Sequence, residues 1–391
     1  MSQKVRLGDY ISIKGGGTPN KAIEGYWNGN IPWMSVKDLK STVVKTTINT
    51  ITPTGLANSA ANLITKGSLI IATRMAVGKV VYAGMDTAIN QDLKAITVSS
   101  GLYHKYLFYQ LNSMQDYFER NSKGATVKGI KLDVLRDLEI PLPPLEEQKK
   151  IAAILDAADD YRQKTKALIH KYDELTQSLF LDMFGDPVTN PMGWEFNRLD
   201  KVSFLTTKGS SPNWQGFEYM SEGVRFVTSE NVRLGHLDLL KDKFVAFEFH
   251  DKLLRSQLKE NDLLVNLVGA SIGRGALVTP SVLPANINQA VAKTELDLSK
   301  VNPLFVLYQV ITPQVQERLI GNKVEGARAN ISLKNVRELD LYIPPLSLQN
   351  QFAERVAQIQ QQKQQAESSL VKAEELFSSL LQRAFKGELT S

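Results

Sequence analysis

Several short groupings of residues in this chain have the composition of catalytic or ligand-binding motifs. Asp38-Leu39-Lys40 and Asp92-Leu93-Lys94 each place an acid two residues before a lysine, as some nucleases do, but a three-residue match is expected by chance. Gly78-Lys79 is followed by Val80 and lacks the upstream glycine of a phosphate-binding loop. No Gly-x-Ser-x-Gly elbow of a hydrolase occurs. We therefore predict that the chain has no catalytic residues.

Metal binding and methyl transfer are also not indicated by the sequence. The four histidines have no metal-ligand spacing and the chain has no cysteine, so we expect no metal site. The proline pairs Pro143-Pro144 and Pro344-Pro345 are not preceded by Asn or Asp and not followed by an aromatic residue. The Asn/Asp-Pro-Pro-aromatic loop of amino methyltransferases is therefore missing.

The strongest pattern in the chain is an internal repeat with a period of about two hundred residues. The peptide LEIPLPPLEEQ (Leu138 to Gln148) recurs as LDLYIPPLSLQ (Leu339 to Gln349), and each copy opens a long stretch with no Gly or Pro. RLGDYISIKGGGTP near the start is echoed by RLDKVSFLTTKGSSP from Arg198. Two related globular halves, each followed by a long helix, are predicted.

Both long stretches show the three-and-four spacing of a coiled coil. At about 1.5 Å per residue, each helix would span on the order of 55 to 60 Å. The predicted seams comprise Ile151, Ile154, Ala158, Tyr161, Thr165, Leu168, Tyr172, Leu175 and Leu179 in the first stretch, and Phe352, Val356, Ile359, Lys363, Ala366, Leu370, Ala373, Phe377 and Leu380 in the second. We expect the two helices to cover each other's seams in an antiparallel pair; ordinary bundle helices are the alternative.

The segments between the helices mix strand and helix patterns. Apolar runs at 67–73 and 262–268 are typical of buried strands, and 103–117 and 303–319 have the spacing of amphipathic helices. The predicted fold class is therefore α+β, with two similar domains in a pseudo-two-fold arrangement separated by the antiparallel coiled coil.

Composition sets the broad class of the protein. The chain has 391 residues, 43% hydrophobic residues and a net charge of +5, which is ordinary globular material large enough for two cores. Residues 1–145 hold 17 Lys and Arg against 10 Asp and Glu, whereas 186–346 are balanced. A polyanionic partner of the first half is one interpretation, and a modest positive excess without any anionic partner is the other. The absence of cysteine, of a membrane-spanning run and of a signal peptide favours a cytoplasmic location and predicts no membrane partner.

In its combination of parts the sequence resembles the DNA specificity subunits of type I restriction-modification systems. The resemblance covers essentially the whole chain and rests on the tandem plan together with the peptides GGGTP, GYWNGNIPWMSVKDL, LIIATRMAVGK, INQ and PLPPLEEQ. It implies target-recognition domains at 1–145 and 186–346, each reading half of an interrupted DNA site. It also implies a central helix at 146–185, for spacing and partner docking, which pairs with a C-terminal helix at 347–391.

The resemblance further implies partners and cofactors that belong to those partners. Two modification subunits would methylate adenine with S-adenosylmethionine, and restriction subunits would translocate DNA with ATP and Mg²⁺. No cofactor is expected in this chain.

Base edges are read by Arg, Lys, Asn, Gln, Ser and Thr on loops, and phosphates mainly by Lys, Arg and backbone amides. The glycines from Gly15 to Gly17 would let the backbone approach a phosphate closely. The candidates for contact with DNA in the first half are Lys14, Gly16, Thr18, Ser35, Lys37, Arg74, Lys79, Lys123 and Lys128. Those in the second half are Lys208, Ser210, Ser211, Thr228, Ser229, Asn231, Ser271, Arg274, Lys323 and Arg328.

Some residues and functions keep two interpretations. Asn90-Gln91 and Asn288-Gln289 could read adenine, but satisfying buried backbone groups is the favoured role. Trp27 and Trp33 are expected to pack in the core or at its rim, with a wedge between base pairs as the alternative. The alternative to DNA reading is a coiled-coil adaptor that binds no DNA, and a further one is a standalone nuclease or methyltransferase.

Overall fold

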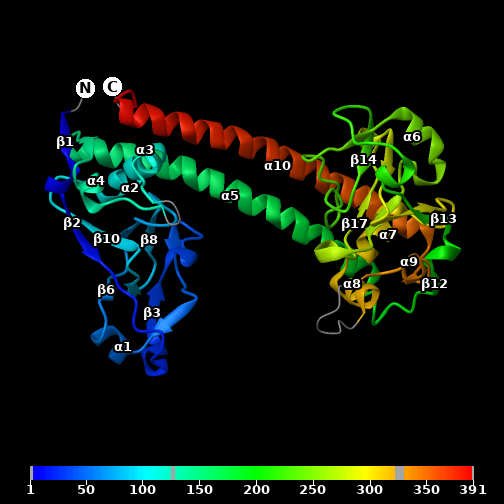
Figure 1. Ribbon diagram of the computed structural model, residues 1–391, viewed down its shortest axis with the longest axis horizontal. Helices are drawn as coiled ribbons and strands as arrows, with labels where there is room; N and C mark the ends of the chain where they lie inside the picture. The colour runs from blue at the N-terminus through cyan, green and yellow to red at the C-terminus, as the bar shows by residue number, and fades with distance from the viewer. Residues whose placement is uncertain (1–2, 125–127, 322–329, 390–391) are drawn as a thin grey trace. The chain divides into compact units, whose positions relative to one another are not determined.

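The computed structural model describes residues 3–124, 128–321 and 330–389 (Figure 1). The chain divides into two compact units. Met1–Lys166 together with Glu367–Ser391 form what we call the first unit, and Ala167–Ala366 form the second unit. Each unit contains strands, short helices and part of both long helices, so the α+β class predicted from the sequence is confirmed.

The first unit is built on two small sheets. The central strand of its larger sheet is a run of four buried apolar residues, as expected where both faces are covered. In order of pairing that sheet comprises β2 (Ile11–Gly15), β10 (Leu93–Val98), β7 (Leu69–Ala72), β8 (Val80–Ala83) and β4 (Val43–Val44). The other comprises β5 (Asn49–Ile51), β3 (Trp27–Met34), β9 (Thr87–Ile89) and β6 (Asn62–Ile64). The remaining elements are the pair β1 (Lys4–Arg6) and β11 (Glu139–Pro141), and the helices α1 (Pro53–Ala57), α2 (His104–Asn112), α3 (Gln115–Arg120) and α4 (Leu132–Arg136).

The second unit repeats this plan in the same chain order. Its larger sheet pairs β13 (Ser203–Lys208), β19 (Val291–Leu296), β16 (Leu263–Asn266) and β17 (Gly275–Leu277), which correspond to β2, β10, β7 and β8. Its other sheet pairs β15 (Phe244–Val245), β14 (Val224–Val227) and β18 (Ala285–Ile287). The remaining elements are the pair β12 (Phe196–Arg198) and β20 (Asp340–Tyr342), and the helices α6 (Phe247–Lys252), α7 (Pro303–Val310), α8 (Pro313–Ile320) and α9 (Leu333–Arg337).

The two long helices are α5 (Leu145–Phe184) and α10 (Leu346–Lys386), and each begins directly after a proline pair. The glutamine of the repeated junction peptide explains how each helix start is fixed. Gln148 is fully buried; its Nε2 donates to the Pro143 carbonyl and its Oε1 accepts from the Tyr103 amide, both at 2.8 Å. Gln349 bonds Pro344 and Asn302 with the same geometry. The repeated peptide therefore ties each long helix to the domain before it.

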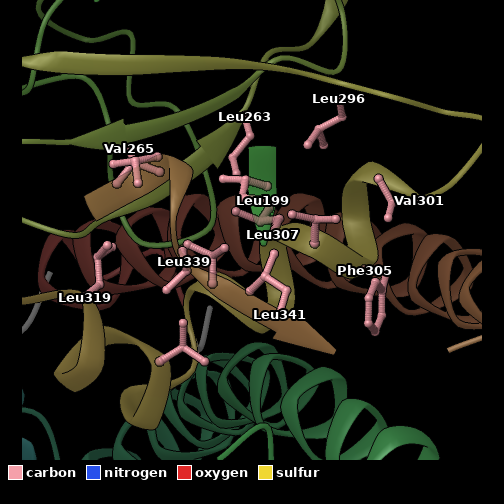
Figure 2. Packing of buried hydrophobic residues seen from close by; sticks show 14 of the residues in the cluster. Leu199, Leu263, Val265, Leu296, Val301, Phe305, Leu307, Leu319, Leu339 and Leu341 are labelled. Atoms are coloured by element: carbon pink, nitrogen blue, oxygen red, sulfur yellow. The ribbon is translucent and has the colours of Figure 1, made fainter. Parts of the chain in front are cut away.

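The core of the second unit lies between its larger sheet and its helices (Figure 2). Phe305 and Leu307 of α7 pack there with Leu263 and Val265 of β16. Both long helices contribute aromatic rings, because Phe180 of α5 and Phe352 of α10 lie with their ring centroids 5.6 Å apart. The core of the first unit likewise includes Ile151 and Leu155 of α5 together with Ala384 of α10. Each core is therefore completed by residues from both long helices.

The long helices pair in antiparallel fashion within each unit. In the first unit the Arg162 guanidinium lies 4.3 Å from the centre of the Phe377 ring, and Lys166 Nζ lies 2.8 Å from Glu374 Oε1. In the second unit Lys363 Nζ lies 2.6 Å from Asp173 Oδ1. As residue numbers rise along α5, those of the partners on α10 fall.

The predicted seam of α10 lies where it was expected, but that of α5 needs a correction. On α10, Phe352, Val356, Ala366 and Ala373 are buried, and Ile359, Leu370, Phe377 and Leu380 are half-buried. On α5, Ala158, Tyr172 and Leu179 are half-buried. By contrast, four predicted seam residues are 38 to 53% exposed, namely Ile154, Tyr161, Leu168 and Leu175.

The predicted seam residues Ile151 and Thr165 are buried as expected, and the observed seam also contains polar residues that the prediction did not include. Thr165 and Thr176 are buried because their hydroxyls donate to carbonyls one turn earlier, at 2.9 and 3.0 Å. Arg162 covers the Phe377 ring. The seam therefore runs one position away from the apolar line at Ile154 and Tyr161.

A pair of neighbouring substitutions tests this correction. We expect Leu155→Ala to lower the free energy of unfolding of the first unit by about 2–5 kcal/mol, because the Leu155 side chain is fully buried. Ile154→Ala should change it by less than about 1 kcal/mol, because Ile154 is 38% exposed. Urea unfolding of the two variants measures this difference. A larger loss for Ile154→Ala than for Leu155→Ala would support the predicted seam instead of the observed one.

Candidate nucleic-acid interface

Loops from three strands of the first unit meet at one sheet edge. Strands β3 and β9 run parallel, with Met34 paired to Ile89, so Ser35 and Asn90 follow at the same edge. The Asn90 amide donates to the Met34 carbonyl at 3.0 Å. The loop after β2 joins them, because the Gly17 amide donates to the Ile89 carbonyl at 3.0 Å. We call this loop-bearing edge the first reading edge.

The second unit builds the same edge from the corresponding strands. Val227 of β14 pairs in parallel with Ile287 of β18. The Asn288 amide donates to the Val227 carbonyl, and the Gly209 amide donates to the Asn288 carbonyl, both at 3.1 Å. We call this the second reading edge. The repeated sequence therefore produces a repeated backbone frame.

Gly16 and its repeat Gly209 are required for this frame by close backbone approach. A Cβ atom at Gly16 would lie 2.1 Å from the Ile89 carbonyl oxygen, and one at Gly209 would lie 1.6 Å from that of Ile287. These distances are far below van der Waals contact, so only glycine lets the loop lie against the edge. The neighbouring Gly15 has room for a side chain, since the atom nearest to a Cβ at that position would be 3.9 Å away.

Three predicted base-contacting residues serve instead to hold the frame. Ser35 is 8% exposed, and both its amide and its hydroxyl donate to Asp38 Oδ2. In the second unit the amide and hydroxyl of Thr228 donate to Asn231 Oδ1 in the same way. Asn231 is 2% exposed and its Nδ2 donates to the Asp238 carbonyl at 3.0 Å. Ser35, Thr228 and Asn231 are therefore buried within the frame, although Ser35 also lines the hollow at the first reading edge.

The asparagines of the two Asn-Gln pairs have the structural role that the sequence favoured. Asn90 Nδ2 donates to Asp92 Oδ2 at 3.0 Å, and Asn90 Oδ1 accepts from the Asp92 amide. Asn288 Oδ1 accepts from the Ala290 amide at 3.1 Å. Gln91 differs from both, because it is exposed and its amide oxygen contacts the Thr18 hydroxyl. Gln91 and Thr18 can therefore present polar atoms at the first reading edge.

A hollow of about 600 Å³ opens at the first reading edge. Trp27 and Trp33 pack edge to face in its wall with ring centroids 5.2 Å apart, and Trp33 Nε1 donates to the Gly17 carbonyl. Trp33 is 6% exposed, so it packs in the core rather than forming a wedge. The wall also includes Thr18, Lys37, Met75, Gln91 and Asp92.

Basic residues from two further loops reach the first reading edge. Arg74 follows β7 with its side chain 60% exposed, and its Nη1 lies 4.0 Å from Asp92 Oδ1. Gly129 bridges both Arg74 and Lys123, and the Lys128 carbonyl accepts from the Met75 amide at 3.1 Å. The exposed lysines Lys37, Lys79, Lys123 and Lys128 thus lie on loops that also carry the reading edge or adjoin it. Lys14 is exposed on β2 and donates to the Leu63 carbonyl.

The second reading edge carries different side chains. Lys208 is exposed at the end of β13, and Ser211 and Ser229 are half-buried. Ser210 Oγ accepts from Gln215 Nε2, and Ser271 Oγ accepts from Asn266 Nδ2. Arg274 lines a separate hollow with Arg233 and His236. The predicted contacts Lys323 and Arg328 lie outside the described residues.

The repeat shows which positions the frame leaves free. Counted along the matching loops, Lys37 corresponds to Glu230, and Asp92 corresponds to Ala290. Arg74 corresponds to Val268, because each forms an isolated bridge to the loop before the next short helix. The shared positions are therefore structural, while the side chains that face outward differ in size, charge and polarity.

The acid-x-Lys fragments are used to build the fold. Asp38 is buried and accepts from the backbone amides of Ser35 and Ile48. Lys94 donates to the Gln91 and Leu93 carbonyls, and burial lowers the pKa of its amine. Within the described ranges no group of three or more His, Asp and Glu side chains has the arrangement of a metal site. Across those same ranges, no helix combines the length and apolar character needed to cross a membrane.

The sequence of this chain is similar to those of known proteins. Residues 2–175 match the family model described as type I restriction modification DNA specificity domain. The EcoBI specificity subunit of Escherichia coli is 26% identical over 344 residues, covering 80% of this chain and 71% of that protein. The MjaIX specificity subunit of Methanocaldococcus jannaschii is 28% identical over 227 residues, covering 53% of this chain and 52% of that protein.

Two solved structures share the fold over nearly the whole chain. The S subunit of a type I restriction-modification system from M. genitalium has a TM-score of 0.57 at 17% identity and covers 98% of this chain and 96% of its own. A chain from a structure on assembly and conformational transition of the type I system has a TM-score of 0.60 at 18% identity, covering 99% and 98%.

The fold is a tandem repeat whose two reading edges share a frame and differ in their outward side chains. Residues 2–175 match the type I restriction modification DNA specificity domain, and over most of its length the chain is similar to a type I specificity subunit.

Proposed function

We propose that the chain binds double-stranded DNA at an asymmetric, bipartite site, with one half read by each reading edge. The observation that carries this proposal is the pair of reading edges, which share their parallel strand pairing and its amide-to-carbonyl bond. The edges differ at Lys37 and Glu230, at Arg74 and Val268, and at Asp92 and Ala290. Outward side chains on a rigid edge are what base reading requires. Because the two sets differ, the two halves of the target differ.

The proposed partners are those implied by the resemblance to type I specificity subunits. Two modification subunits bind the chain and methylate adenine with S-adenosylmethionine, and restriction subunits supply ATP- and Mg²⁺-dependent translocation and cleavage. This chain performs no bond chemistry and holds none of these cofactors. The purified chain alone, incubated with DNA, Mg²⁺ and S-adenosylmethionine, should neither methylate nor cleave, and either activity would contradict the proposal.

The decisive experiment maps methylated adenines in a genome that carries the chain and its partner subunits. We expect a single interrupted sequence with two dissimilar halves. Exchanging residues 1–145 for those of another specificity subunit should change one half only. New bases on both sides of the gap would contradict independent reading by the two units.

We further propose that the paired helices set the length of the unread gap. One heptad inserted into both α5 and α10 should add about 10 Å at roughly 1.5 Å per residue. That length corresponds to about three base pairs at roughly 3.4 Å each. Mapping of methylated adenines reads the gap directly, and an unchanged gap would show that the helices do not set it.

The salt dependence of duplex binding distinguishes the proposed function from the alternative, an adaptor that does not bind DNA. Duplex affinity of the assembled complex should fall steeply between 50 and 200 mM salt if Lys and Arg contact phosphates. Substituting Lys123 and Lys128 together by glutamine should lower affinity for all sequences alike and flatten that dependence. Affinity that is absent in the unsubstituted complex would favour the adaptor.

The central helix is also proposed to dock the modification subunits. Ile154 and Tyr161, on the part of α5 that belongs to the first unit, are 38% and 53% exposed and contribute little to the seam. We expect Tyr161→Glu to lower co-purification of the modification subunit without lowering the unfolding temperature of the chain.

A further inference from the structure

Met75 follows Arg74 on the loop after β7, and its backbone adopts a left-handed conformation with φ of +64°. This conformation is uncommon for a residue with a side chain. The matching residue in the second unit is Gly269, with φ of +80°. The match is fixed by the backbone, because Thr73 and Leu267, two residues before each, accept from the amides of Ile130 and Ile331 at 2.9 Å. Glycine therefore suffices for this turn, and the fold alone does not require a methionine.

The Met75 side chain is 67% exposed and lines the hollow of the first reading edge. The wall combines the apolar side chains of Trp27, Trp33 and Val36 with polar ones that include Thr18, Lys37 and Gln91. A large apolar side chain is thus exposed on a strained backbone, beside a hollow that also carries polar groups suited to reading DNA. Strain of this kind is characteristic of functional sites.

The neighbouring Arg74 side chain is held in one orientation, yet its guanidinium remains accessible to a ligand. Its stem packs on Gly129, where a Cβ atom would come within 3.0 Å of Arg74 Cγ. Its guanidinium faces Asp92 Oδ1 at 4.0 Å, and Asn90 holds the other oxygen of that carboxylate. The side chain remains 60% exposed, so its donors are free for a ligand.

We propose that Met75 and Arg74 act together as a base-reading pair of the first unit, which rests on the proposed DNA-binding function. Arg74 donates to O6 and N7 of a guanine, the usual partner of an exposed, oriented guanidinium in the major groove. Met75 packs against the C5-methyl group of a thymine in an adjacent base pair. The second unit, with Val268 and Gly269 at these positions, reads its half-site without this pair.

The test uses the full chain assembled with its modification subunits and a duplex carrying the mapped site. Each thymine of the half-site assigned to the first unit is replaced in turn by deoxyuridine, which removes only the methyl group. We expect one replacement to weaken binding about fourfold, the effect of losing one buried methyl group. The Met75→Gly complex should bind the thymine duplex about as weakly, and should not distinguish it from the deoxyuridine duplex.

The same design tests Arg74 with 7-deazaguanine, which lacks the N7 acceptor. Arg74→Ala should lose about 5- to 150-fold in affinity for the native site and no longer respond to the analogue. Met75→Leu serves as the conservative variant and should retain discrimination against deoxyuridine. Met75→Gly should unfold at the same temperature as the unsubstituted chain or higher, because glycine relieves the left-handed backbone.

Three results would overturn the pairing. The mapped half-site could lack a guanine and thymine in adjacent pairs, deoxyuridine could be tolerated at every position, or Met75→Gly could retain full discrimination. Failure of the proposed function itself looks different, because the unsubstituted complex would then bind no duplex sequence-specifically.

Discussion

Replacing Gly16 with alanine is expected to abolish recognition by the first unit while leaving the second unit intact. The new Cβ atom would lie 2.1 Å from the Ile89 carbonyl oxygen and 2.4 Å from that of Asn90. Both are backbone atoms of the first reading edge, so the loop must move away from the strands. We expect a loss of about 1–3 kcal/mol in the free energy of unfolding from overpacking. Because Thr18 moves with the loop, affinity for the target duplex should fall by about tenfold or more, and methylation of the mapped site should be lost.

Gly15→Ala is the matched control for this prediction. The two glycines are adjacent, but a Cβ atom at Gly15 would meet only the Lys94 side chain, at 3.9 Å. The control should keep both stability and methylation. Equal behaviour of the two variants, measured by urea unfolding and by mapping methylated adenines, would show that close approach at Gly16 does not shape the edge.

Replacing Asp262 with alanine is expected to destabilise the second unit by about 3–5 kcal/mol. Lys293 Nζ lies 3.0 Å from Asp262 Oδ2, and the two side chains are 2% and 1% exposed. Burial raises the pKa of the Asp262 carboxyl, so desolvation opposes the charge that the contact with Lys293 favours. Removing one partner leaves a buried ammonium whose remaining acceptor among the described residues is the Gln257 carbonyl. Urea unfolding should show the loss in the transition that contains the second unit.

The first unit supplies the control for this pair. Lys293 pairs with Leu264 across β19 and β16, as Ala95 pairs with Ile70 across β10 and β7. Ala95 and Ser68 therefore occupy the corresponding positions without charges. The double variant Asp262→Ser with Lys293→Ala should be more stable than Asp262→Ala alone, because no buried charge remains unpaired. A double variant less stable than Asp262→Ala would give the opposite answer. The attraction between Asp262 and Lys293 would then contribute more to the free energy of unfolding than the unpaired Lys293 charge takes away.

Much of the architecture was predictable because the repeat constrains it twice. The α+β class, the strands around Leu69 and Leu263 and the starts of the long helices after the proline pairs all follow from local patterns. The seam of α10 was predictable because its buried positions are nearly all apolar or alanine. On α5 the same reasoning correctly selected Ile151 and Thr165, but it also selected Ile154 and Tyr161, whose neighbours Leu155 and Arg162 are the more buried residues.

The reading edges were harder to predict than the fold. Ser35, Thr228 and Asn231 have the chemistry of base readers, but only the fold shows where their hydrogen bonds go. The Ser35 and Thr228 hydroxyls donate to the side chains of Asp38 and Asn231, and Asn231 donates to the Asp238 carbonyl. Met75 was missed for the opposite reason: a methionine in a loop has no polar signal. The corresponding residue of the second unit, Gly269, was the available clue. A glycine at that position indicates a backbone conformation that disfavours side chains, and Met75 adopts the same conformation in the first unit.

The division of the chain has a consequence for how it folds during synthesis. The second unit is continuous from Ala167 to Ala366, whereas the first unit needs Glu367–Ser391 to complete a core that contains Ala384. On the ribosome, the earlier-made domain must therefore wait, partly open, until translation is nearly finished, while the later-made one can close first. A nonsense codon shortly after Ala366 would accordingly harm the domain encoded farthest upstream.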